Sequence, residues 1–204
     1  MNWGVVHLFV FDTMADWEAS FAIAAINNPQ FQRMPGRYRV VTVGARLDPI
    51  TTVGGLHILP EVALTDVNPR DSAMLILPGG DLWEAGGNAE AVAKARAFCA
   101  AGVPVAAICA ATLGLARAGM LDDFHHTSNS RAYLATSGYR GGNFYCDVPA
   151  VTDEGVITAS GIAPVEFARE IFRTLSLYSA DALDAWYALF RLGNATRYLE
   201  LASA

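Results

Sequence analysis

The chain has 204 residues, of which 53% are hydrophobic and 17% are charged, with a net charge of −6 and a pI near 5.1. This composition excludes intrinsic disorder, and the length fits a single domain over residues 1–204. The acidic balance argues against nucleic acid or a membrane surface as a partner, and no apolar run is long enough to cross a bilayer or act as a signal peptide.

Short apolar runs rich in β-branched residues alternate with helical patterns along the chain. We expect strands at residues 4–11, 38–44, 73–77, 103–107 and 155–159, and a small hairpin at residues 51–59. Helices are expected at residues 15–26, 89–101, 110–118, 131–136, 164–178 and 182–200.

The strand runs are mostly uninterrupted rather than alternating, which is typical of strands covered on both faces. The sequence therefore predicts an α/β fold, a flavodoxin-like three-layer α/β/α sandwich around a mainly parallel sheet. Ligands of such sheets bind beyond the carboxyl ends of the strands. Three predicted strands end in polar or reactive sequence there, namely Asp12 to Glu18, Pro78 to Trp83, and Cys109.

Cys109 lies between the apolar run 103–108 and a helical stretch of small residues. This arrangement predicts a nucleophile elbow, a strained strand-to-helix turn that small neighbours such as Ala107, Ala110 and Ala111 tolerate. A cysteine at a helix N-terminus is expected to favour the thiolate. The alternative is a buried cysteine that serves as a small hydrophobic residue.

The turn Leu77-Pro78-Gly79-Gly80 follows a predicted buried strand. The backbone N–H groups of Gly79 and Gly80, with that of Ala110, are candidates to stabilise an oxyanion beside the cysteine. The alternative is a simple turn that ends a strand.

Together these pieces resemble the ThiJ/PfpI superfamily, which has a class I glutamine-amidotransferase-like fold. The matching strings are Phe9-Val10-Phe11 with Asp12 to Glu18, the Pro78-Gly79-Gly80 turn, Ala106-Ala107-Ile108-Cys109, and Ile157-Thr158-Ala159-Ser160-Gly161. They occur in the family's order, so the resemblance covers roughly residues 4 to 178. It implies a homodimer that acts on a small-molecule substrate.

The resemblance implies that Cys109 is the nucleophile and that Glu18 is the acidic residue placed against its sulfur. A carboxyl kept protonated by burial would donate a hydrogen bond to the thiolate and later shuttle a proton. Asp16 is a rival for this role, and an ordinary first-turn glutamate is the structural alternative for Glu18.

The chain also departs from the family pattern. Many members carry a histidine 20 residues after the nucleophile, where this chain has Asn129, which can bind a substrate but cannot act as a base. Peptidase-like members have a histidine directly after the cysteine, where this chain has Ala110. Peptidase activity is therefore not expected. Glutamine amidotransferase activity is not expected either, because the segment from Ser160 to Glu166 offers no histidine for a glutaminase triad.

His125 and His126 lie just upstream of Asn129, on an expected short strand, and either could enter the site in place of the missing histidine. Trp17 and Trp83 are expected near the pocket rim, where each could line a small apolar pocket or cap the core. With Asp16, Asn129 and His126 they complete the candidate substrate pocket. No metal-ligand spacing is present, so neither a metal nor another cofactor is expected.

The leading hypothesis is a cysteine-dependent enzyme acting on a small carbonyl, amide or nitrile-like substrate. The alternative is a redox-sensing or stress-response protein whose Cys109 is oxidised to sulfenic or sulfinic acid. Three cysteines without a disulfide pattern indicate a reducing cytoplasm. Aromatic residues of the C-terminal helix offer either a dimer surface or packing within the domain, namely Trp186, Tyr187, Phe190 and Tyr198.

Overall fold

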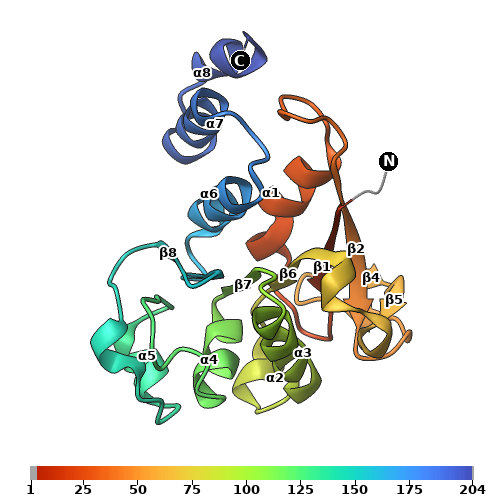
Figure 1. Ribbon diagram of the computed structural model, residues 1–204, viewed down its shortest axis with the longest axis vertical. Helices are drawn as coiled ribbons and strands as arrows, with labels where there is room; N and C mark the ends of the chain where they lie inside the picture. The colour runs from red at the N-terminus through yellow and green to blue at the C-terminus, as the bar shows by residue number, and fades with distance from the viewer. Residues whose placement is uncertain (1–3, 204) are drawn as a thin grey trace.

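A seven-stranded sheet forms the centre of the molecule (Figure 1), and the computed structural model describes residues 4–203. The predicted domain's residues 1–3 and 204 lie outside the described part. Strand order is β5-β2-β1-β6-β7-β9-β8, and every neighbouring pair is parallel except β8 with β9. The strands are β1 (Gly4–Phe9), β2 (Tyr38–Gly44), β5 (Val62–Ala63), β6 (Ser72–Leu77), β7 (Val105–Ile108), β8 (Ala150–Asp153) and β9 (Val156–Ala159), with a separate hairpin of β3 (Ile50–Thr51) and β4 (His57–Ile58).

Helices cover both faces of the sheet, which confirms the predicted three-layer α/β class. Helices α1 (Asp16–Asn27) and α6 (Pro164–Leu175) pack together on one face, and α3 (Ala89–Ala100) and α4 (Ala110–Arg117) lie on the other (Figure 1). The remaining helices are α2 (Asp81–Glu84), α5 (Arg131–Ala135), α7 (Ala180–Leu192) and α8 (Arg197–Ser203), with 3₁₀ turns at Leu64–Asp66, Pro69–Asp71 and Gly141–Phe144.

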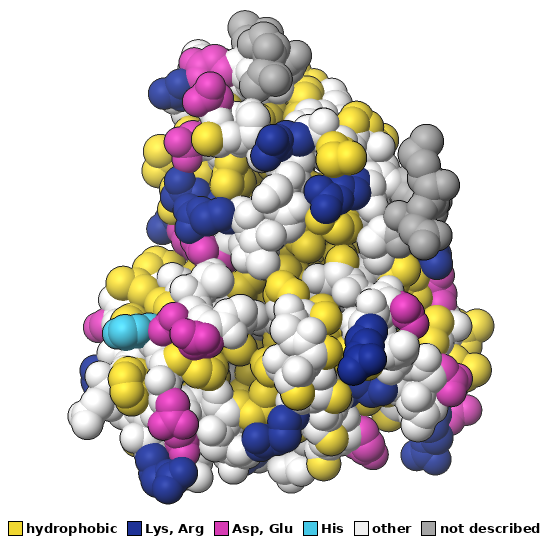
Figure 2. All heavy atoms as spheres, viewed as in Figure 1, with side chains coloured by type: hydrophobic (Ala, Val, Ile, Leu, Met, Phe, Trp, Pro, Cys, Tyr) yellow, Lys and Arg dark blue, Asp and Glu magenta, His cyan; other side chains and the backbone are white. Residues whose placement is uncertain are grey.

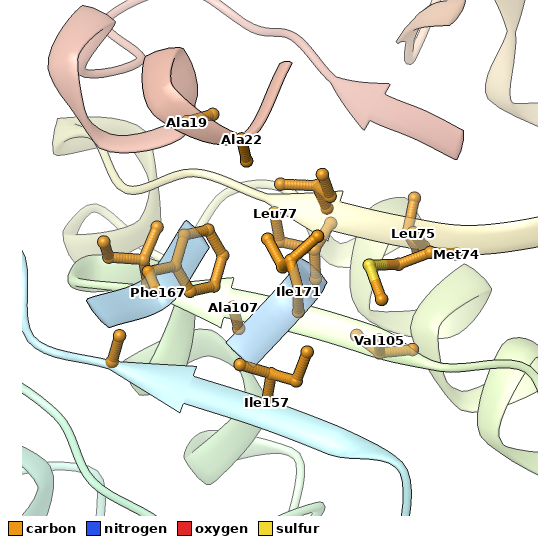
Figure 3. Close-up of a cluster of buried hydrophobic side chains, with 14 of the residues drawn as sticks. Ala19, Ala22, Met74, Leu75, Leu77, Val105, Ala107, Ile157, Phe167 and Ile171 are labelled. Atoms are coloured by element: carbon orange, nitrogen blue, oxygen red, sulfur yellow. The ribbon is translucent and has the colours of Figure 1, made fainter. Parts of the chain in front are cut away.

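The core lies between the sheet and these helices. Figure 3 shows side chains of α1 and α6, among them Ala22 and Phe167, directed at Leu77 of β6 and Ala107 of β7. Small alanines in α1 let this helix approach the sheet closely. The approach positions the start of α1, with Glu18, beside the ends of the central strands.

Most predicted elements are confirmed, with differences at the ends of the chain and the sheet. The predicted helix 182–200 is two helices, because Gly193 ends α7 in the left-handed conformation at φ +64°. Edge strands β5 and β8 were not predicted from the sequence. The expected strand at His125 and His126 is only a single bridge between His126 and Tyr145.

The surface mixes acidic and basic side chains with apolar ones on the face shown in Figure 2. Within residues 4–203, no helix is both long and apolar enough to cross a bilayer.

Candidate functional site

Cys109 occupies the sharp turn between β7 and α4, at φ +58° and ψ −128°. This is a region that non-glycine residues rarely adopt, so the turn is strained as the elbow interpretation predicts. The Cys109 N–H donates to the carbonyl of Ala159 at 3.0 Å, and the Thr112 hydroxyl donates to the carbonyl of Cys109 at 2.6 Å. These bonds secure the strained residue to β9 on one side and α4 on the other.

Two glycines from facing loops make room for the cysteine side chain. A Cβ on Gly79 would lie 2.7 Å from Cys109 Cβ, and a Cβ on Gly161 would lie 2.7 Å from Cys109 Sγ. Gly161 was not among the predicted site residues, although it closes the string after the strand at 155–159 that the sequence analysis singled out. The small neighbours that the elbow requires therefore include residues far away in sequence.

Glu18 lies in the first turn of α1 and is fully buried. The Gly79 N–H donates to its Oε2 at 2.5 Å. Its Oε1 has no hydrogen-bond partner among the described residues. It faces the same glycine as the Cys109 thiol, since a Cβ on Gly161 would lie 3.2 Å from Oε1 and 2.7 Å from Sγ. Burial raises the pKa of Glu18 from an ordinary 4.5 to about 7, against the lowering effect of the Gly79 N–H and the thiol.

Asn129 lies beside the cysteine, 20 residues further along the chain. Its side-chain amide donates to Cys109 Sγ at 3.3 Å, and its Oδ1 accepts the Gly161 N–H at 2.9 Å. The second bond orients the amide, so that the NH₂ group points at the sulfur. Asn129 thus occupies the predicted place in the site as a hydrogen-bond donor.

The surroundings of Cys109 raise the pKa of its thiol to about 12, through burial first and then the negative charge of Glu18. The Asn129 amide and the Ala110 N–H act in the opposite direction. The helix N-terminus was expected to favour the thiolate, and this expectation was wrong for the resting site. The hydration that a buried thiolate loses costs more than the helix N-terminus restores. A carboxyl with a pKa near neutrality next to a thiol is the arrangement of a base beside a nucleophile.

The predicted oxyanion donors divide into two groups. The Gly79 N–H is occupied by Glu18, so its assignment as an oxyanion donor was wrong. Gly80 lines the cavity beside Cys109, and its N–H has no acceptor among the described residues. The Ala110 N–H points at the sulfur.

The two tryptophans have different places. Trp17 is 53% exposed at the cavity mouth, and its indole N–H donates to the Gly161 carbonyl at 3.1 Å. Trp83, by contrast, is fully buried, packs its ring over Gly114, and donates to the Pro78 carbonyl at 2.9 Å. Trp83 therefore belongs to the core, and its placement in the substrate pocket was wrong.

Neither histidine reaches the cysteine. His126 is fully buried and bonds through its ring nitrogens to the Phe124 carbonyl and the Tyr139 hydroxyl, so its placement in the substrate pocket was wrong. His125 Nδ1 lies 2.9 Å from an Asp153 carboxylate oxygen on the surface. Both side chains have structural partners that account for them.

Asp16 was the rival of Glu18, and the structure turns it away from the cysteine. Its carboxylate accepts the Thr52 hydroxyl at 2.5 Å and the Gly54 N–H at 2.7 Å. These bonds hold the loop between β3 and β4 against the start of α1. Asp16 therefore shapes a neighbouring surface groove and does not contact the sulfur.

The cavity at Cys109 has a volume of about 120 Å³. Two carboxyl side chains that were not predicted, Asp81 and Glu84, line it together with Thr13, Ala15, Trp17, Glu18, Val53, Gly80, Cys109 and Ala110. Their signal in the sequence was their position directly after the Pro78-Gly79-Gly80 turn. Among the described residues, no group of three or more His, Cys, Asp or Glu side chains is arranged to hold a metal ion.

Comparisons with known proteins agree on one family. The DJ-1/PfpI family model matches residues 5–174. The "Uncharacterized protease YoaZ" of Bacillus subtilis is 40% identical over 96% of this chain and 95% of its own length. The "Glutathione-independent glyoxalase DJR-1.2" of Caenorhabditis elegans is 28% identical over 69% of this chain and 75% of its own.

Solved structures give the same result. A thiJ/pfpI family protein from Bacillus anthracis superimposes with a TM-score of 0.91 at 36% identity, covering 100% of this chain and 98% of the other. The DJ-1 superfamily protein Atu0886 from Agrobacterium tumefaciens gives a TM-score of 0.81 at 34% identity, over 93% and 98% of the two chains.

Proposed function

Because the chain belongs to the DJ-1/PfpI family, whose members named above include a glyoxalase and an uncharacterised protease, we propose a cysteine-dependent enzyme that acts on small carbonyl, amide or nitrile compounds. Cys109 is the nucleophile and Glu18 its proton partner. The observation that carries this proposal is the buried Glu18 carboxyl, whose Oε1 faces the same glycine as the thiol and whose pKa lies near 7.

The first step transfers the thiol proton of Cys109 to the Glu18 carboxylate as the sulfur bonds to the carbonyl carbon. The electron pair of the carbonyl double bond moves to oxygen, where the N–H groups of Gly80 and Ala110 stabilise the negative charge. With an aldehyde, the proton returns from Glu18 to this oxygen and gives a thiohemiacetal.

With an amide, the carbon–nitrogen bond breaks instead, and the leaving amine takes the proton from Glu18. Water then hydrolyses the remaining thioester, with Glu18 as the base. Asn129 holds the sulfur in place through its amide, and no proton passes through it. No cofactor takes part in these steps.

A small substrate is favoured over a peptide. The cavity volume of about 120 Å³ accommodates only a few heavy atoms, and neither a histidine nor a lysine is among its described lining residues. Peptide hydrolysis, which the name of the Bacillus subtilis relative indicates for that protein, should therefore be absent or very slow here.

The redox alternative receives less support from the site. Oxidation to sulfenic acid follows thiolate character, and burial together with Glu18 raises the pKa of Cys109. A reducing compartment such as the cytoplasm would keep Cys109, like the other two cysteines, in the free thiol form.

The test is a turnover screen with purified protein against small dicarbonyls, primary amides and nitriles. We expect wild-type protein to turn over one of these classes, Cys109→Ser to be inactive, and Glu18→Gln to lose at least about a hundredfold in kcat, as is typical for loss of a general base. Full activity in Cys109→Ser would contradict the proposal. Oxidation of Cys109 by dilute peroxide, without turnover of any class, would favour the redox alternative.

A further inference from the structure

All ionisable side chains that line the Cys109 cavity, apart from the thiol itself, are carboxyls. Glu18 lies at its base, and Asp81 and Glu84 line it from α2. No lysine, arginine or histidine is among its described lining residues. A ligand in this cavity therefore meets carboxyl groups and no cationic side chain among the lining residues.

Glu84 is held in place by a hydrogen bond rather than by an ion pair. The Tyr133 hydroxyl of α5 donates to Glu84 Oε1 at 2.9 Å. The nearby Arg117 guanidinium donates to the backbone carbonyls of Trp83 and Glu84, and within residues 4–203 the Glu84 carboxylate forms no salt bridge. The charge of Glu84 therefore remains available to a ligand.

Tyr133 is half-buried, and its environment keeps the phenol in the neutral form. Burial and the Glu84 carboxylate raise the pKa of the Tyr133 hydroxyl, and Cys109 makes a smaller contribution in the same direction. The phenol therefore keeps its proton and remains a hydrogen-bond donor to Glu84.

Two further features point to a ligand in this cavity. Glu18 Oε1 is fully buried and unpaired with any N–H or hydroxyl group of residues 4–203. The Trp17 ring is fixed at the mouth by its bond to Gly161, where an aromatic face attracts a cation.

We propose that the cavity selects substrates that carry a positively charged amine beside the reacting carbonyl, amide or nitrile carbon, with Glu84 as the specificity-determining residue. This inference rests on the proposed function and names its substrate class. Amino aldehydes and amino amides fit this description, whereas oxo acids and other carboxylates are rejected by Glu84 and Asp81.

The test measures charge selectivity at Cys109 without requiring turnover. Three methanethiosulfonate reagents carry an aminoethyl cation, a sulfonatoethyl anion or a neutral methyl group. The Cys109 thiol gives its proton to Glu18 and its sulfur attacks the divalent sulfur of the reagent, so that methanesulfinate leaves and a mixed disulfide forms. Mass spectrometry assigns the modification to Cys109. The rate of each charged reagent is divided by the rate of the neutral reagent. This ratio is then divided by the same ratio measured with free 2-mercaptoethanol, which removes the intrinsic reactivity of the reagents.

We expect wild-type Cys109 to react with the cation at least about tenfold faster than with the anion. The electrostatic energy between unit charges a few ångströms apart near a protein surface is large enough for a rate ratio of this size. Glu84→Gln should remove most of that preference, and Tyr133→Phe should reduce it by releasing the carboxylate. The matched control is Glu90→Gln, which removes an exposed charge in the first turn of α3 and should leave the preference unchanged.

A wild-type preference near one, or one that Glu84→Gln leaves intact, would overturn the inference. A preference that Glu90→Gln abolishes equally would overturn it too, because the effect would then come from the net charge of the protein. A charge-selective Cys109 in a protein that turns over no substrate class would contradict the proposed function but not the charge selectivity of the cavity.

Discussion

Replacing Glu18 with glutamine should change how the stability of the protein depends on pH. The folded protein raises the pKa of this carboxyl from 4.5 to about 7 because the side chain is fully buried. An acid with a raised pKa stabilises the folded state fully below its unfolded pKa, and that stabilisation is lost as pH rises through the folded pKa. Wild-type protein should therefore lose stability between about pH 4.5 and pH 7 relative to Glu18→Gln.

The size of the effect follows from the shift. Each pKa unit corresponds to about 1.4 kcal/mol, so raising the pKa from 4.5 to about 7 changes the free energy of unfolding by about 3 kcal/mol in total. About 2.5 kcal/mol of this falls between pH 5 and pH 8. Cys109, with a pKa near 12, does not titrate in this range. His7, whose pKa burial lowers to about 4, contributes equally to both proteins and cancels in the difference.

The assay is urea unfolding of wild type and Glu18→Gln at several pH values, with Glu90→Gln as an exposed glutamate control. Glutamine keeps an oxygen for the Gly79 N–H, so the pH dependence, rather than the stability at one pH, carries the result. We expect the free energy of unfolding of wild type to fall by about 2.5 kcal/mol relative to Glu18→Gln from pH 5 to pH 8. Parallel curves would refute the claim that burial raises the pKa of this carboxyl to near neutrality.

Four further predictions follow from the structure. Gly161→Ala should reduce Cys109 alkylation and turnover at least about tenfold, because its Cβ would lie 2.7 Å from the sulfur, whereas Gly142→Ala, with open space around it, should have no effect. Asn129→Ala should slow Cys109 alkylation near neutral pH by about tenfold, the order expected for a lost hydrogen bond to the developing thiolate. Trp83→Ala should lower the free energy of unfolding by about 3–5 kcal/mol in urea titrations, since the ring is fully buried. Sedimentation equilibrium should give twice the 21.8 kDa mass of the chain, and a mass of 21.8 kDa at all concentrations would contradict the expected homodimer.

The strand-to-helix turn at Cys109 could be predicted because its signal is local. An apolar strand, a reactive residue and a run of small helical residues lie next to each other in the sequence. The family resemblance then gave Glu18 and Asn129 their places, and the structure puts both within reach of the sulfur.

The remaining features depend on packing between distant segments, which no local pattern contains. Trp83 follows the Pro78-Gly79-Gly80 turn and was expected near the pocket rim, where it could line the pocket or cap the core, but Gly114 leaves room for its ring inside the fold. The Gly79 N–H turns toward Glu18 because α1 passes directly beside this turn. The pKa of Cys109 likewise depends on burial by loops around the site, not only on the helix that follows it.

The aromatic residues of the C-terminal helices illustrate the same limit. Trp186 packs against Phe172 and Phe21 of its own chain, with a ring-centroid distance of 4.8 Å to Phe172. Phe190 and Tyr198 remain about half exposed. The sequence left open whether these aromatic residues form a dimer surface or pack within the domain, because it did not show which of them the chain covers itself.

The role of Glu18 as proton acceptor for Cys109 is best tested by the pH dependence of Cys109 alkylation by iodoacetamide, measured in wild type and in Glu18→Gln. We expect the alkylation rate of wild-type Cys109 to rise with pH, with an apparent pKa near 7 set by Glu18 as the proton acceptor. Glu18→Gln should lose this step and react at least about tenfold more slowly near neutral pH. Identical profiles for the two proteins, with Cys109 no more reactive than Cys99 and Cys146, would contradict the account.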